Sequence, residues 1–276
     1  MANKIINRKI FIVITSACLL LAFFSSKVNA QEKKQFLINT IGLNITNNDT
    51  KDLKNLKQLI KDKRPKAIYL EQWILLEPGN KKLLKKLHKI AKSSDSKLHL
   101  VVGKNSWFGD RGISNTLEYL NFYEKDIDGI VLRTEPNKIN VWKDDIAITT
   151  QILNQMLDAY LEIYKEARKR NKIFVVEFPF WYNDFLGPFR SFPEDACAYS
   201  NRVSFLIDKP EKLKELKNWN NISCLYNINL TKRATTHTEE EIASIYNELK
   251  EELSFYSNFN GFIIDSDIKD PSLHLE

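Results

Sequence analysis

The chain has 276 residues, 43% of them hydrophobic, and a formal net charge of +6 at neutral pH. Lys4, Arg8, Lys9 and Lys27 supply four positive charges and residues 1–30 contain no acid, so residues 31–276 carry 6 − 4 = +2. A net charge this small removes the main support for nucleic-acid binding by bulk electrostatics. The remaining length suits a single domain with a sizeable core.

Residues 1–30 have the pattern of a secretory signal peptide. A basic start is followed by the apolar run Ile10–Phe24, which is short for a membrane span, and by small residues at Val28–Ala30. We therefore expect residues 1–30 to be removed and the protein to be secreted or periplasmic, without stable membrane insertion. The alternatives are an uncleaved anchor and a lipoprotein signal built on Cys18, although Cys18 lies within the apolar run and not at its end.

Two cysteines remain after the expected cleavage, Cys197 and Cys224. Export to an oxidising compartment makes one disulfide possible, but Cys224 falls inside a predicted strand, where a buried free thiol is the alternative. The four histidines are scattered and no Cys/His spacing is typical of a metal site. We expect neither a metal nor a cofactor.

Apolar and helical patterns alternate along the chain. Strands are expected at Phe36–Ile45, Ala67–Trp73, Lys97–Val102, Gly129–Glu135, Ile173–Phe178, Arg202–Ile207, Ile222–Ile228 and Gly261–Ile264. Helices are expected at Asp49–Asp62, Gly79–Lys92, Ile113–Tyr123, Asp144–Arg170, Glu211–Trp219 and Thr238–Tyr256. Asp49 or Thr50 is the expected cap of the first helix, Asp144 or Asp145 that of the fourth, and Thr238 with Glu241 forms a capping box for the last. Lysines alternate with leucines over Gly79–Lys92, which indicates the solvated face of an amphipathic helix.

Eight strands separated mostly by helices predict an α/β fold, a single (β/α)8 TIM barrel over residues 31–276. Residues 181–201 contain Gly187, Pro188 and Pro193 and no clean helical period, so they predict an irregular long loop after strand five. A doubly wound open sheet is the alternative, but no glycine cluster follows the first strand.

Barrel enzymes place their chemistry where the strands end, at the C-terminal rim. The residues that this chain puts there are carboxylates, amides and flat aromatic rings, as a sugar site requires. Glu135 and Glu177 are the candidate catalytic residues. The candidate substrate-binding residues are Glu71, Trp73, Trp107, Arg133, Trp181, Tyr182, Asp208, Asn227 and Asp265. Loop-rich barrel ends also gather acids as helix caps, and a tryptophan can equally serve the core.

The stretch Asp128–Glu135 resembles the strand-four motif of glycoside hydrolase family 18, the chitinase-like barrels. Asp128, Gly129, Ile130, Leu132 and Glu135 match the pattern Asp-Gly-φ-Asp-φ-Asp-x-Glu, where φ is apolar. The resemblance implies a glycosidase-like barrel with Glu135 in the place of the proton donor. Both inner aspartates are replaced, by Val131 and Arg133, and Arg133 is expected to pair with Glu135 and to lower its pKa.

The tripeptide Thr134-Glu135-Pro136 is also similar to the Asn-Glu-Pro end of strand four in the large retaining-glycosidase clan. That clan needs a second glutamate on strand seven, where this chain has Asn227 and Asn229.

Two functions remain open at this point. The first is an exported glycosidase that acts on an extracellular or envelope polysaccharide. The second is a glycosidase-like barrel without turnover that binds carbohydrate or a protein partner, which the arginine at position 133 favours. Trp73, Trp107 and Trp181 follow three different strands and are expected to line one cleft. The sequence gives no prediction of the oligomeric state.

Overall fold

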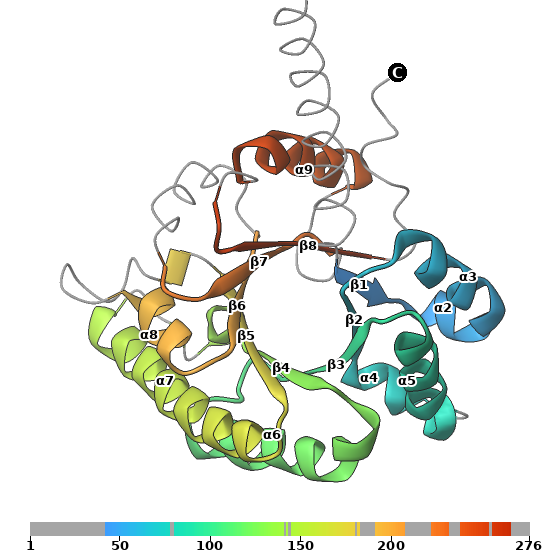
Figure 1. Cartoon of the computed structure of the whole chain (residues 1–276). Coiled ribbons are helices and arrows are strands. Elements are labelled where there is room, and N and C mark those ends of the chain that lie inside the picture. Colours follow the sequence, from blue (N-terminus) through green and yellow to red (C-terminus); the bar gives the residue numbers. More distant parts are fainter. Residues whose placement is uncertain are drawn as a thin grey trace, which may run out of the picture. The chain divides into compact units, whose positions relative to one another are not determined.

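The computed structural model confirms a closed barrel of eight parallel strands surrounded by helices (Figure 1). It describes residues 42–77, 80–140, 142, 145–179, 181–182, 191–207, 222–231, 238–253 and 256–265. The strands are β1 (Gly42–Ile45), β2 (Ala67–Glu71), β3 (Lys97–Val102), β4 (Gly129–Arg133), β5 (Ile173–Pro179), β6 (Arg202–Leu206), β7 (Leu225–Asn229) and β8 (Phe259–Asp265). Each strand pairs in parallel with the next, and β8 pairs with β1 to close the barrel. The open-sheet alternative is therefore wrong.

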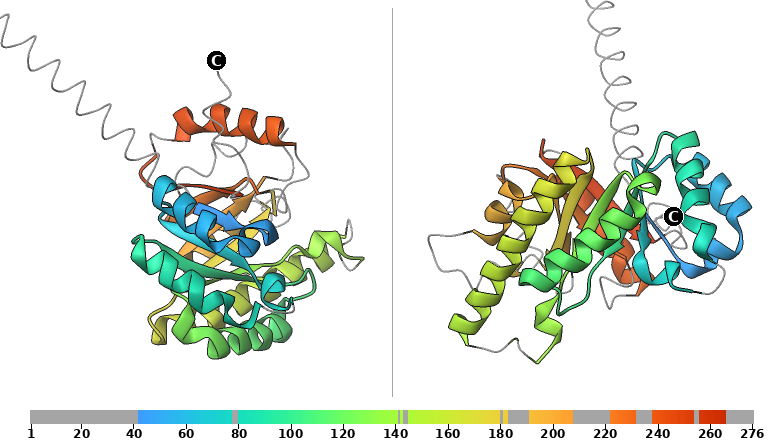
Figure 2. Two further views of the ribbon diagram at one scale, coloured as in Figure 1. Left: turned by 90° about the vertical axis from the view of Figure 1, so that its right-hand side faces the viewer. Right: turned by 90° about the horizontal axis from the view of Figure 1, so that it is seen from below.

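Helices follow most strands and cover the outside of the barrel, as the views in Figure 2 show. The α-helices are α2 (Asn47–Lys51), α3 (Leu53–Lys63), α4 (Gln72–Leu75), α5 (Leu83–Ser93), α6 (Gly109–Tyr123), α7 (Ile146–Lys169), α8 (Phe192–Ala198) and α9 (Glu239–Leu253). Short 3₁₀ helices are η1 (Asn80–Lys82), η2 (Glu124–Asp126) and η3 (Pro136–Lys138). No described helix is long and apolar enough to cross a membrane.

The helix caps explain where several helices begin. Asp145 caps α7, and Thr238 and Glu241 form the predicted capping box before α9. The expected first helix is instead two helices, because Asp52 accepts hydrogen bonds from the backbone N–H groups of residues 54 and 55 and starts a new helix there. The cap of α2 is Thr46, paired with Asp49, so the prediction of a cap at Asp49 or Thr50 was wrong.

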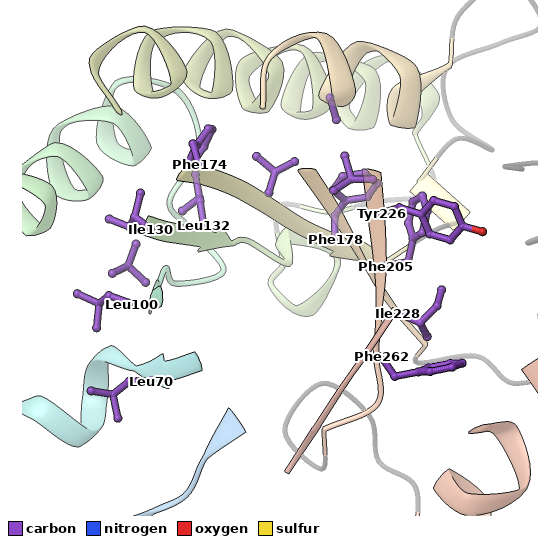
Figure 3. Close-up of a cluster of buried hydrophobic side chains, with 14 of the residues drawn as sticks. Leu70, Leu100, Ile130, Leu132, Phe174, Phe178, Phe205, Tyr226, Ile228 and Phe262 are labelled. Carbon is purple, nitrogen blue, oxygen red and sulfur yellow. The ribbon is translucent and has the colours of Figure 1, made fainter. Parts of the chain in front are cut away.

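Two layers of side chains fill the domain. Outward-facing strand residues pack against the helices in a large cluster, part of which Figure 3 shows with Leu70, Ile130 and Phe178. A separate cluster lies inside the barrel. It contains Tyr69 together with small or β-branched residues such as Val131. Residues two apart on a strand share a face, so the residue that follows Val131 on the inner face of β4 is Arg133.

Two strand boundaries and one helix differ from the prediction in ways that matter for the site. β2 ends at Glu71, so Trp73 belongs to the short helix α4. The stretch predicted as a long loop after strand five contains the helix α8, which begins at Phe192 behind an N-cap of Ser191 and has a proline in its first turn, while residues 183–190 lie outside the described residues. β7 begins at Leu225, so Cys224 precedes the strand and forms a disulfide with Cys197 of α8, with Cα atoms 5.4 Å apart.

Several predictions lie outside the described residues. They are the signal peptide at residues 1–30, the start of the first strand, the helix at 211–219 and the substrate-binding role of Asp208.

Candidate functional site

A buried ion triad crosses the inside of the barrel at its C-terminal end. The guanidinium of Arg133 donates to Glu71 from β2, with Nη1 and Oε1 2.6 Å apart, and its Nε donates to Oε1 of Glu177 from β5. All three side chains are at most 9% exposed. Burial opposes the charge of Arg133, but the carboxylates of Glu177 and Glu71 together raise its pKa above the ordinary arginine value. The arginine therefore stays charged and ties three strands together.

Glu177 accepts hydrogen bonds at both of its carboxylate oxygens. Its second oxygen, Oε2, accepts from Oγ of Ser204 on β6 at 3.0 Å and from Nδ2 of Asn229 on β7 at 2.6 Å. With Arg133 on Oε1, donors from three strands fix the orientation of this carboxylate. Such a group is held for electrostatic work or for structure, and it is not placed to give away a proton.

The backbone beside the triad is shaped by a glycine. Gly103, after β3, has φ = +137°, and a Cβ there would lie 1.9 Å from the carbonyl oxygen of Arg133. The side-chain amide of Gln72 donates to the carbonyl of Gly103 at 2.9 Å. The chain thus passes close to β4 at the point where β4 delivers its arginine, which only glycine permits.

Glu135 lies just past the end of β4 and is buried, at 5% exposure. Its ion-pair partner is Lys138 of η3, three residues on, with Nζ and Oε1 2.6 Å apart. The predicted direct pair with Arg133 was wrong, because β4 ends at Arg133 and the backbone turns into η3 after it. Arg133 instead forms one ion pair with Glu71 and one with Glu177.

The pKa of Glu135 is raised above the ordinary glutamate value. Burial is the main cause, and the charge of Glu177 adds to it, while Lys138 and Arg133 act in the opposite direction. The predicted lowering by Arg133 exists but is outweighed by desolvation. A buried carboxyl with a raised pKa is what a general acid requires.

Two further predicted residues occupy different levels of the barrel. Asp265 at the end of β8 accepts from Nδ2 of Asn44 on β1 at 2.7 Å, and both are buried. Asn227 does not lie among the carboxylates, because its amide contacts Tyr69 at 3.5 Å within the apolar layer and accepts from Asn260. On β7 it is Asn229, two residues on, that reaches Glu177.

The predicted tryptophans follow β2, β3 and β5, but they contact different neighbours. Trp107 is 5% exposed and packs against Tyr119 of α6, with ring centroids 6.1 Å apart. Trp181 is 6% exposed and meets the edge of Trp142, which stacks on Tyr182 at 5.1 Å. Little surface of Trp107 or Trp181 is therefore free for a sugar ring. The half-buried Trp73 and Trp142 present more ring surface.

An aromatic cluster is joined to Glu135 through η3. The hydroxyl of Tyr182 donates to Oδ1 of Asn137, which lies between Pro136 and Lys138. Trp142, Trp181 and Phe178 surround the Tyr182 ring. The short helix η3 therefore contacts Glu135 through Lys138 and the aromatic cluster through Asn137.

Sequence reasoning missed several residues of this site. Ser204, Asn44 and Lys138 received no prediction, although strict alternation along β6 and β1 points the first two into the barrel. Lys138 is three residues from Glu135, a spacing that a helical turn brings together. No group of three or more His, Cys, Asp or Glu among the described residues is arranged to hold a metal ion.

No protein-family model matches the chain, and no characterised protein matches it in sequence. The barrel is similar to several solved structures. The YdjI aldolase from Escherichia coli K12 is 8% identical with a TM-score of 0.54, covering 86% of this chain and 79% of its own.

Two carbohydrate-active structures are similar to the same degree. The C-terminal domain of a putative chitinase from Desulfitobacterium hafniense is 11% identical with a TM-score of 0.52, covering 68% of this chain and 66% of its own. A β-1,3-glucanosyltransferase from Rhizomucor miehei is 8% identical with a TM-score of 0.51, covering 84% and 87%. Likeness at this identity shows a TIM-barrel fold that glycosidases and aldolases share.

Proposed function

We propose that the protein is an exported glycoside hydrolase that acts on an extracellular or envelope polysaccharide, with Glu135 as its proton donor. Solved barrels of this shape include a chitinase domain and a glucanosyltransferase. The disulfide between Cys197 and Cys224 supports export, because disulfides persist in oxidising compartments. The resemblance of Asp128–Glu135 to the family 18 motif is part of this proposal.

The observation that carries the proposal is the contrast between two neighbouring glutamates. Burial raises the pKa of Glu135 above the ordinary glutamate value, which is the direction that a general acid requires. Glu177 accepts from Arg133, Ser204 and Asn229, which suits a fixed negative charge. Glycoside hydrolysis needs such a pair, one carboxyl to protonate the leaving oxygen and one carboxylate to stabilise or attack the positive sugar centre. Environments that differ in this way assign the acid and its partner.

The other predicted residues receive supporting roles in this proposal. Arg133, itself paired with Glu71, holds Glu177 in place, and Asp265 at the end of β8 provides a further buried carboxylate. Trp73 and Trp142 are proposed to contact the sugar, and the buried Trp107, Trp181 and Tyr182 are proposed to support the sugar-binding surface from beneath. Asp208 keeps its proposed substrate contact, and Asn227 is reassigned to the support of the barrel interior.

The alternative is a carbohydrate-binding barrel without turnover. The observation in its favour is that both oxygens of Glu177 already accept hydrogen bonds, which reduces its strength as a nucleophile or base. In that case the triad serves the stability of the barrel alone.

The experiment compares the wild type with Glu135→Gln, Glu177→Gln and the surface control Glu162→Gln. Each protein is tested for release of reducing ends from a panel of neutral, amino and acidic polysaccharides, and for its melting temperature. The hydrolase proposal expects Glu135→Gln to lose turnover at a melting temperature no lower than that of the wild type. Binding of a polysaccharide without release of reducing ends by the wild type supports the binding barrel, and full turnover by Glu135→Gln overturns Glu135 as the donor.

A further inference from the structure

Positive charge is concentrated in one part of the chain. Residues 51–97 contain 14 Lys or Arg and five Asp or Glu, a net charge of +9. Residues 98–276 contain 21 Lys or Arg and 28 Asp or Glu, a net charge of −7. The small net charge of the whole domain therefore results from a strongly positive part, which includes β2, and a negative remainder.

The fold gathers these charges on two neighbouring helices. α3 and α5 pack side by side on the outside of the barrel (Figures 1 and 2). Their apolar residues, such as Leu56, Ile60 and Leu87, are buried against the strands. The exposed sides carry a set of lysines that we call the basic face: Lys54, Lys57 and Lys61 on α3, and Lys85, Lys86 and Lys89 on α5.

The lysines of the basic face are not neutralised within the described part of the protein. None of the six has an ion pair there, and α5 contains no acid. The exposed acids of α3 and its cap, Asp62 and Asp52, accept hydrogen bonds from Gln58 and from the start of the helix. On α7, in contrast, Lys165 and Lys169 each pair with a glutamate three residues before them, at 2.7 and 2.5 Å.

We propose that the basic face binds a polyanionic chain, a polymer whose repeating units carry carboxylates or phosphates. Exposed lysines on two adjacent helices can contact successive negative charges of one polymer. Lysine is a flexible point charge, suited to a diffuse anion more than to one shaped group. Helix axes in contact lie about 8–10 Å apart, so one chain can contact both rows.

A chain fits this face better than a membrane does. Peripheral membrane helices add large apolar side chains that enter the lipid. The exposed large apolar residues of the described structure are Leu76, Phe122, Ile146 and Leu225, and none lies on α3 or α5. The expected export would bring the basic face into contact with extracellular or envelope polymers. The inference does not depend on the hydrolase proposal, because these lysines are exposed on the outer helices α3 and α5 while the carboxylates Glu71, Glu135 and Glu177 are buried.

The test measures binding of the full mature chain to polygalacturonate, to poly(glycerol phosphate) and to neutral dextran. The variant is Lys85→Gln/Lys86→Gln/Lys89→Gln, and the matched control is Lys125→Gln/Lys165→Gln/Lys169→Gln, which removes the same charge from other exposed sites. Circular dichroism and melting temperature confirm that both fold. Vesicles with anionic lipids form a separate arm, and preference for one polymer tells carboxylate from phosphate.

We expect the wild type and the control to bind one or both polyanions and not dextran. Binding weakens as salt rises from 0.05 to 0.5 M, since the Debye length is only about 10 Å at 0.1 M. The basic-face variant should bind about tenfold more weakly or worse, since one lysine near an anionic surface contributes roughly fivefold. Equal loss in both triple variants, binding that resists salt, or binding of vesicles alone would each overturn the proposal.

Discussion

Replacing Arg133 by methionine removes the cation of the triad and leaves two carboxylates in the barrel. Glu71 is 3% exposed and Glu177 1% exposed, so water cannot easily take over the role of the guanidinium. Breaking a buried ion pair on one side costs about 3–5 kcal/mol. Ser204 and Asn229 still donate to Glu177, which keeps the expected loss within that range. This is a large part of a total stability of about 5–15 kcal/mol.

Urea unfolding followed by circular dichroism measures the loss. The melting temperature should fall by about 6–20 °C, at about 2–4 °C for each kcal/mol in a domain of this size. The matched control is Arg170→Met, whose surface pairs with Glu124 and Glu166 should contribute about 1 kcal/mol or less. The loss should shrink in the combination with Glu71→Gln and Glu177→Gln, because neutral amides leave no buried negative charge without a cation. A loss below about 1 kcal/mol, or one of the same size in that combination, would refute the triad as a buried charge network.

Three other predictions concern stability. Glu135→Gln should be neutral or stabilising, because the raised pKa of Glu135 stabilises the folded wild type at low pH and that stability is lost as pH rises through the folded-state pKa. The melting temperature of the variant should therefore rise above that of the wild type by a margin that grows from pH 4 to pH 8. A margin that stays constant with pH would count against the raised pKa. The double variant Cys197→Ser/Cys224→Ser should unfold about 3–4 kcal/mol more easily, as expected for a loop of 27 residues, and an unchanged urea midpoint would mean that the bridge does not constrain the unfolded chain. Gly103→Ala should cost at least about 1–3 kcal/mol, because its Cβ would meet the Arg133 carbonyl at a positive φ; wild-type stability would show that the approach of the two backbones is not required.

The barrel was predictable because parallel strands buried on both faces leave continuous apolar runs separated by helical periods. Asp145 and the pair Thr238–Glu241 were correctly read as caps, since these signals are local. Asp52 was not recognised as a cap, because a one-residue break between two helices does not disturb the helical spacing of the apolar residues that follow it. The same limit hid α8, where Pro193 in the first turn looks like a loop residue.

The sequence allowed us to predict where most of the charged site residues lie, but not which residues they pair with. Alternation correctly placed Arg133 and Glu177 at the inner rim, but which acid pairs with Arg133 depends on strand neighbours that are distant in sequence. Glu135 was expected to pair two residues back and pairs three residues on, because the strand ends before it. The predicted direction of the Glu135 pKa shift was wrong for a related reason. Burial raises this pKa, and the burial depends on the packing of several segments at the end of the barrel.

The most direct test of the central claim compares two substrates of one sugar, chosen from the polysaccharide panel, with wild type and Glu135→Gln. One substrate is the natural oligosaccharide, whose leaving group needs a proton, and the other is an aryl glycoside with a strongly acidic phenol, which leaves without one. If Glu135 is the general acid, Glu135→Gln should lower kcat/KM about 10²–10⁴-fold on the oligosaccharide and far less on the aryl glycoside. An equal loss on both substrates, or no loss on the oligosaccharide, would contradict the assignment of Glu135 as the proton donor.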